Sequence, residues 1–126
     1  MFISKKDIEQ LVNNKELLIT PFDADGLKEI SYTFRLGGDA SEVTIQPNEF
    51  IILESLESIH FPSYLGGILS TRGSIAKLGL DCLLTDTIIE PWSEGRLTFC
   101  TKNNTDQTIC LKLGTPLVKC VFIKIN

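Results

Sequence analysis

Short apolar runs with a period of two, separated by turn residues, constrain the fold of this chain more than any other feature. Residues 32–36, for example, alternate in polarity and end at Gly37-Gly38. We expect strands at the runs of this kind, which cover residues 17–20, 32–36, 42–45, 50–53, 58–61, 65–70, 83–84, 87–89, 96–102, 107–113 and 117–125. Many short strands with glycine, proline and asparagine turns are typical of a β-sandwich or a small barrel. The sequence therefore predicts an all-β fold.

A short helix and one marked turn complete the pattern. Ser4 followed by Asp7 is a variant of the helix capping signal, and apolar residues then recur at helical spacing until Asn13-Asn14. We expect residues 103–106, Asn-Asn-Thr-Asp, to form a hairpin turn between two strands. Since no repeat, linker or low-complexity segment divides the chain, we expect one domain over residues 1–126.

Charge and cysteine content restrict the classes of partner. A formal net charge of −4 and a pI of about 4.9 count against binding of nucleic acid through a basic surface, whereas a nucleotide needs only a few local cations. The four cysteines form no C-x-x-C pair and the chain has one histidine, so we expect buried free thiols in a reducing cytoplasm and no zinc site. No apolar leader follows Met1 and no run is long enough for a membrane span, which favours a cytoplasmic protein without a membrane partner.

The first candidate for chemistry is the stretch Ser-Thr-Arg-Gly-Ser-Ile-Ala-Lys at residues 70–77. Gly73 allows a close backbone turn, the hydroxyl of Ser74 can contact an anion, and Arg72 and Lys77 supply positive charge. A helix beginning near Ser74 would also aim free N–H groups at that anion. The sequence thus predicts a phosphate-binding turn. The alternative is an ordinary strand-to-helix connection with serine as the cap.

The second candidate is the stretch Ile-Ile-Glu-Pro-Trp-Ser-Glu-Gly at residues 88–95. Glu90 could hold a water molecule and Trp92 could wall a pocket for a base. The alternative is an acidic turn between strands with Trp92 partly buried. We interpret His60 as structural, because no nucleophile or acid pattern lies near it in the sequence.

Taken in order, these stretches resemble the dCTP deaminase branch of the dUTPase superfamily over nearly the whole chain. Residues 4–9 and 17–21 are similar to its opening helix and its L-x-I-x-P segment. The remaining matches are residues 31–37 to S-x-D-x-R-L-G, residues 71–80 to G-R-S-S-L-A-R-x-G-L, residues 85–95 to T-A-x-x-I-D-P-G-W-x-G, and residues 114–118 to P-G-x-x-I. Five motifs in the right order and spacing make the resemblance specific.

The resemblance implies a distorted, jelly-roll-like β-barrel with a short N-terminal helix, assembled as a homotrimer with nucleotide sites at the subunit interfaces. Family members deaminate dCTP, hydrolyse dUTP or do both, and Mg²⁺ accompanies the triphosphate. Three groups of residues acquire roles on this basis: Arg72, Gly73, Ser74 and Lys77 at the phosphates, Glu90 as the catalytic carboxylate that holds water or metal, and Thr85, Ile89 and Trp92 in the base pocket.

Departures from the family motifs concern the chemistry more than the phosphate turn. A strand acid is replaced by Thr33, the first serine of the arginine-serine motif by Gly73, and the glutamate of the relatives' L-E-F sequence falls on Thr98. A hydroxyl does not transfer protons as a carboxylate does. A segment that closes over the nucleotide in relatives would begin after Asn126, so we expect a site without it.

Two functions follow from these features. The departures favour a protein that binds a pyrimidine deoxynucleotide or a protein partner, as a sensor or regulator, with catalysis lost or much reduced. The alternative is an active dUTP diphosphatase or dCTP deaminase with a rebuilt site, in which Glu90 positions the water.

Overall fold

The N-terminal helix forms where the capping signal predicts it. The structure is a computed structural model that describes residues 1–84 and 86–126. Helix α1 spans Lys5–Asn13, begins after Ser4 and buries Ile8 against the sheets. Strand β1, Leu18–Thr20, follows it and stops at Pro21, which has no N–H to extend a ladder. None of the described helices is long and apolar enough to cross a membrane.

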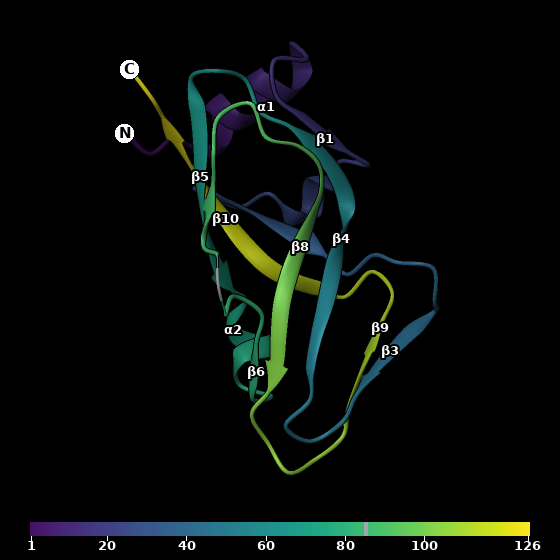
Figure 1. Ribbon diagram of the computed structural model, residues 1–126. Helices are drawn as coiled ribbons and strands as arrows, with labels where there is room; N and C mark the ends of the chain where they lie inside the picture. Colours follow the sequence, from purple (N-terminus) through teal and green to yellow (C-terminus); the bar gives the residue numbers. More distant parts are fainter. Residues whose placement is uncertain (85) are drawn as a thin grey trace.

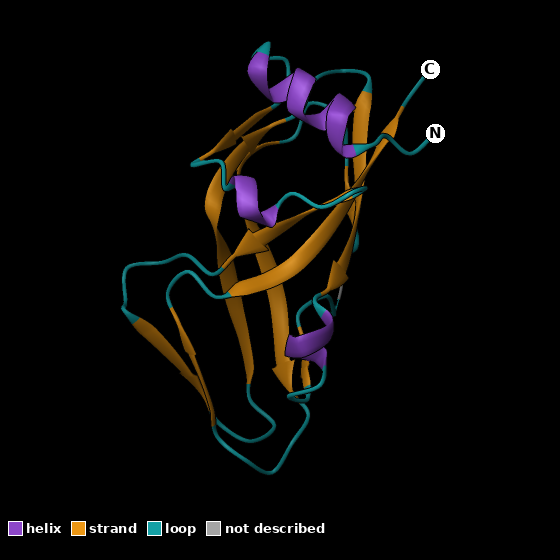
Figure 2. Cartoon of the chain, turned by 180° about the vertical axis from the view of Figure 1, so that it is seen from behind, coloured by secondary structure: helices purple, strands orange, loops and turns teal. Residues whose placement is uncertain are grey.

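Two antiparallel four-stranded sheets face each other and form the body of the molecule (Figures 1 and 2). One sheet has the order β1-β4-β8-β6 and the other has the order β2-β10-β5-β7. The elements after β1 are the 3-10 turn η1 at Ala24–Gly26, β2 Ser31–Arg35, β3 Glu42–Ile45, β4 Phe50–His60, β5 Leu65–Thr71, α2 Gly73–Ala76, β6 Leu80–Asp81, β7 Ile88–Ile89, β8 Glu94–Asn103, β9 Ile109–Lys112 and β10 Pro116–Lys124. Strands β3 and β9 pair as a separate ribbon at the end of the molecule opposite α1 (Figure 1).

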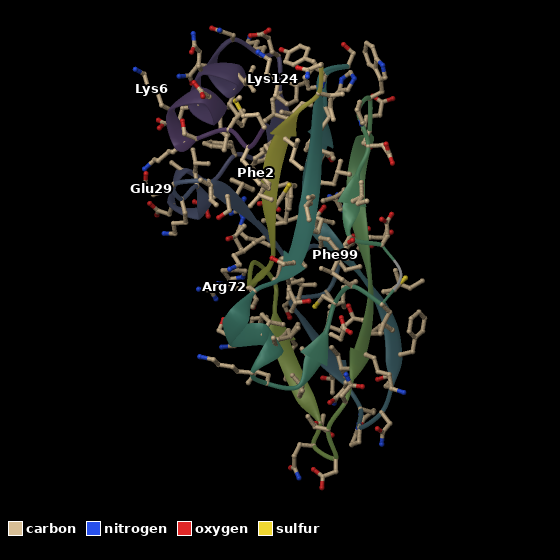
Figure 3. The ribbon with its side chains drawn as sticks, turned by 90° about the vertical axis from the view of Figure 1, so that its left-hand side faces the viewer. Phe2, Lys6, Glu29, Arg72, Phe99 and Lys124 are labelled. Atoms are coloured by element: carbon tan, nitrogen blue, oxygen red, sulfur yellow. The ribbon has the colours of Figure 1, made fainter. Side chains whose placement is uncertain are left out.

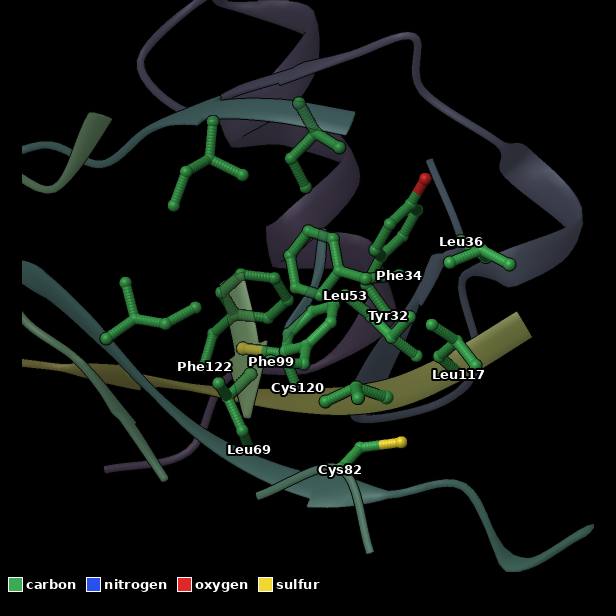
Figure 4. Close-up of a cluster of buried hydrophobic side chains, with 14 of the residues drawn as sticks. Tyr32, Phe34, Leu36, Leu53, Leu69, Cys82, Phe99, Leu117, Cys120 and Phe122 are labelled. Carbon is green, nitrogen blue, oxygen red and sulfur yellow. The ribbon is translucent and has the colours of Figure 1, made fainter. Parts of the chain in front are cut away.

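Alternate strand residues meet between the sheets and make one apolar core (Figure 4). Phe99 of β8 and Phe122 of β10 are almost completely buried there. The ring centroids of Tyr32 and Phe34 lie 5.2 Å apart in an edge-on arrangement, which suits the charge distribution of aromatic rings. The predicted all-β fold with a short N-terminal helix is confirmed.

Four local predictions need correction. Residues 50–53 and 58–61 do not form two strands, because β4 runs through both with a register shift between Glu54 and Ser58. Residues 83–84 are not a strand. The turn at 103–106 does not close a hairpin, since β8 pairs with β4 and β6 whereas β9 pairs with β3. The cysteines are free, but Cys100 is half-buried and Cys110 is exposed.

A buried acid explains why β4 continues through its irregular segment. Glu57 is fully buried, and it accepts hydrogen bonds from the Tyr32 hydroxyl at 2.8 Å and from the backbone N–H and Nε of Arg35 at 3.0 Å each. Burial lowers the pKa of Arg35, but the hydrogen bond and charge of Glu57 outweigh it and raise that pKa overall. This cluster fixes β2 against β4, because a buried charge is tolerated only when it is paired and hydrogen-bonded.

Candidate functional site

The predicted phosphate turn lies at the end of β5, on the surface of the molecule (Figure 3). The backbone N–H of Arg72 donates to Leu117 O at 2.8 Å, which anchors the turn to β10. Helix α2 begins at Gly73, and Arg72 occupies its N-cap position. The helix follows β5 directly, as the alternative of an ordinary strand-to-helix connection expects, but its cap is Arg72 and not a serine. The Ser74 hydroxyl instead accepts a hydrogen bond from Nη1 of Arg72 at 2.8 Å.

Side chains of the turn face outward. Ser74 and Lys77 are exposed, whereas Ile75 between them is buried and holds the short helix against the fold. A Cβ atom placed on Gly73 would meet no atom within 4 Å, so the protomer itself does not require glycine at this position. The structure thus brings Arg72, Gly73 and Ser74 together, with positive charge and a hydroxyl open to solvent.

The second predicted stretch forms β7 and a tight turn. Ile89 is buried and pairs with Gly67 of β5. The backbone carbonyl of Glu90 accepts hydrogen bonds from the Ser93 N–H at 3.2 Å and the Ser93 hydroxyl at 2.6 Å. Its carboxylate is exposed and makes no hydrogen bond to another described residue. Trp92 is 67% exposed, so the alternative of a partly buried tryptophan is wrong. Thr85, the third base-pocket candidate, lies outside the described residues.

A hollow of about 290 Å³ opens between β5, β7 and β8, and we call it the β7–β8 hollow. Its described lining is Leu69, Asp86, Ile88, Ile89, Ser93, Glu94, Arg96, Leu97 and Thr98. Apolar side chains from β5, β7 and β8 thus meet polar and charged ones from β8 and from the segments just before β7 and β8. This combination can enclose a flat base and hydrogen-bond its edge.

The hollow contains one predicted base-pocket residue and several that the sequence did not single out. Ile89 lines it, and so does Thr98, which the sequence singled out only as the position of a lost acid. The sequence analysis missed Asp86, Glu94 and Arg96, because the approach of β8 to β7 depends on tertiary structure. In the sequence, Arg96 is an ordinary strand residue. The two charged residues close together at the start of β8, Glu94 and Arg96, were the available signal.

Neither the predicted phosphate residues nor the acid line this hollow. Arg72, Ser74 and Glu90 are absent from its described lining, as is Trp92. Leu69, the residue of β5 that lines the hollow, precedes Arg72 by three residues. Three residues of extended chain span roughly 10 Å. One protomer therefore presents a phosphate turn and a base-sized hollow as separate features joined by β5.

Metal-ligating side chains are sparse in the part of the chain that the structure describes. No group of three or more His, Cys, Asp or Glu side chains comes together within residues 1–84 and 86–126. Mg²⁺ commonly binds through one or two carboxylates together with substrate phosphates. The exposed carboxylate of Glu90 fits a magnesium ion that arrives on a triphosphate, but not a dedicated protein site.

Known proteins resemble this chain in both sequence and fold. The sequence pattern of a family described as dCTP deaminase-like matches residues 38–125. The dCTP deaminase of Thermococcus kodakarensis is 30% identical, over 89% of this chain and 79% of its own. The dCTP deaminase structure from Agrobacterium tumefaciens superposes with a TM-score of 0.77 at 14% identity, covering 99% of this chain and 49% of that one. This chain thus spans about half the length of the Agrobacterium protein.

A dUTPase shares the fold as well. The enzyme of Staphylococcus aureus phage phi11, whose structure reveals the coordination of a structural Mg(II) ion, superposes with a TM-score of 0.67 at 16% identity, over 87% of this chain and 91% of that one. At such identities the two superpositions establish the fold alone, and they confirm the predicted dUTPase-like barrel. Because the family pattern covers most of the sequence and the archaeal relative is similar along nearly all of it, the chain belongs to the dCTP deaminase-like family.

Proposed function

We propose that this protein binds a pyrimidine deoxynucleoside triphosphate at the interfaces of a homotrimer, with catalysis lost or much reduced, in a sensing or regulatory role. The observation that carries this proposal is the separation of the Arg72 turn from the β7–β8 hollow within one protomer. A second copy that placed its turn beside the hollow would complete a site for phosphates and base. Relatives named as dCTP deaminases identify the ligand class to test. Free thiols at all four cysteines fit a cytoplasmic location.

An exposed apolar sheet face supports assembly. On the outer side of the β2-β10-β5-β7 sheet, Ile88 lies opposite Ile68, Ile68 lies opposite Val121, and Phe2 bridges to Ile123. Phe2, Ile68 and Ile88 are 59%, 41% and 54% exposed. A continuous apolar face of this kind is typical of a protein interface. It includes residues of β5 and β7, the strands that lead to the turn and the hollow.

Thr98 in the hollow and Glu90 in the turn after β7 support reduced chemistry. Deamination needs an acid that delivers protons to the ring and to the leaving amine, and loss of such a group reduces the rate by about two to four orders of magnitude. Thr98 offers only a hydroxyl, and the carboxylate of Glu90 is oriented by no described partner. When bound with a triphosphate, Mg²⁺ would neutralise phosphate charge, with Glu90 as its protein ligand.

One observation favours the alternative of an active enzyme. The carboxylates of Asp86 and Glu94 line the hollow, and either one could hold a water molecule or take up a proton there. In that case the site has been rebuilt with acids at new positions. A protein that binds dUTP or dCTP would then also form the hydrolysed or deaminated product.

Binding and turnover measurements on the purified protein test the proposal. We expect saturable calorimetric binding of dCTP or dUTP with Mg²⁺, no product by chromatography, and loss of binding in Arg72→Ala but not in the control Lys6→Ala, which removes a distant charge on α1. Light scattering should give three times the 14.0 kDa of one chain. Turnover abolished by Glu90→Gln would establish the enzyme instead. If no nucleotide binds, only the role with a protein partner remains.

A further inference from the structure

Arg96 is the one cation in the described lining of the β7–β8 hollow, and an acid from outside that hollow holds it. Its Nη1 lies 3.4 Å from Oε1 of Glu54 on the neighbouring strand β4. Glu54 lines a second hollow, of about 220 Å³, between β4 and the segment that leads into β3. Thr98 lines both hollows. The ion pair therefore lies at the boundary between them.

The pair is weak enough for a ligand to take Arg96 away from Glu54. The side chains of Arg96 and Glu54 are 48% and 41% exposed, so water screens their attraction. Only one of the guanidinium nitrogens makes this contact. The other N–H donors remain available to a group bound in the hollow.

The charged groups of the hollow match the edge of cytosine better than that of uracil. Cytosine presents two adjacent acceptors, O2 and N3, beside a donor, its N4 amine. The guanidinium fork donates in parallel to two adjacent acceptors, and Asp86 or Glu94 can accept from the amine. Uracil places a donor, N3–H, between its two carbonyl oxygens, so the fork cannot engage two neighbouring acceptors.

We propose that Arg96 leaves Glu54 when a cytosine nucleotide binds and donates to O2 and N3 of the base. Arg96 then determines the preference for cytosine over uracil, and Glu54 competes with the ligand for the guanidinium. This inference rests on the proposed nucleotide-binding function and adds the residue that reads the base. It assigns the phosphates to the Arg72 turn, which does not line the hollow.

Two substitutions that break the same ion pair test this role. If Arg96 contacts the ligand, they change the affinity for dCTP in opposite directions, whereas both lower it if the ion pair only supports the structure. Calorimetry with dCTP should show Arg96→Ala weakening binding at least about tenfold, since a charge-assisted hydrogen bond is lost. Glu54→Gln should strengthen it about two- to fivefold, since Arg96 loses its competitor. Arg96→Lys, which keeps the charge and loses the fork, should fall between wild type and Arg96→Ala.

Ligand controls separate the base contact from general electrostatics. Arg96→Ala should weaken dUTP binding less than dCTP binding and leave inorganic tripolyphosphate binding unchanged. The proposal is overturned if both substitutions weaken dCTP binding, if Arg96→Ala binds dCTP as tightly as wild type, or if tripolyphosphate and dCTP lose affinity equally. If wild type binds neither nucleotide, the proposed function fails and this inference fails with it.

Discussion

Trp92 combines two features that are unfavourable for an isolated protomer. Its φ angle is +69°, in the left-handed region where a non-glycine side chain crowds the backbone at a cost on the order of 1–2 kcal/mol. The indole is also 67% exposed and thus gains little from packing. A strained, exposed aromatic residue at the turn after Glu90 fits a contact made only with a ligand or a second copy.

Replacement of Trp92 by glycine should therefore separate stability from binding. We expect Trp92→Gly to raise the free energy of unfolding by about 1 kcal/mol, because glycine adopts positive φ without crowding. The same variant should bind dCTP more weakly, since the exposed aromatic contact to the ligand or to a second copy is lost. Urea unfolding and calorimetry measure the two effects, and Trp92→Phe, which keeps the strain and an aromatic ring, is the control. A stability loss in Trp92→Gly would show that the indole stabilises the protomer.

At the scale of elements, the sequence predicted what depends on neighbouring residues and missed what depends on distant ones. Helix α1 and strands β2, β3 and β5 follow from capping and alternation. Residues 54–57 separate the two strands that the sequence predicts at 50–53 and 58–61, yet Ser55 and Glu57 are buried. Their partners are far along the chain: Leu97 N–H donates to the Ser55 hydroxyl at 2.9 Å, and Tyr32 and Arg35 bind Glu57. The pairing of Arg96 with Glu54 escaped prediction for the same reason.

Replacement of two glycines at element junctions by alanine should change the free energy of unfolding in opposite directions. A Cβ atom on Gly37 would lie 2.5 Å from Ser55 O and 2.7 Å from the backbone of Leu56, so β4 passes directly over this glycine. Gly37→Ala should lower the free energy of unfolding by about 2–3 kcal/mol, because the backbones must separate. Gly73→Ala should raise it by about 0.5–1 kcal/mol, since Gly73 is helical and unobstructed. Thermal and urea unfolding of both variants would check this, and equal effects would contradict the close approach.

For the molecule as a whole, the core determines how the fold responds to alkali. Tyr32, Cys82 and Cys120 are fully buried and ionise only by acquiring a negative charge. Burial raises the pKa of all three groups, and it brings the pKa of Cys82 to about 11 from the ordinary value of 9.0. For Tyr32, the adjacent charge of Glu57 also acts in the same direction. In the folded state these groups therefore keep protons that the unfolded chain releases.

The stability of the protein should consequently be independent of these groups below about pH 9 and fall between about pH 9 and pH 11. In that range the unfolded state binds fewer protons at Cys82 than the folded state, so each rise of one pH unit favours unfolding by about 1.4 kcal/mol for this thiol alone. Urea unfolding at a series of alkaline pH values measures the slope.

Cys82→Ala should be less stable near neutrality, because a buried thiol is lost, but should show a shallower decline above pH 9. Cys110→Ala, which removes an exposed thiol, should decline as wild type does, and a Cys82→Ala curve parallel to wild type would mean that Cys82 ionises equally in both states.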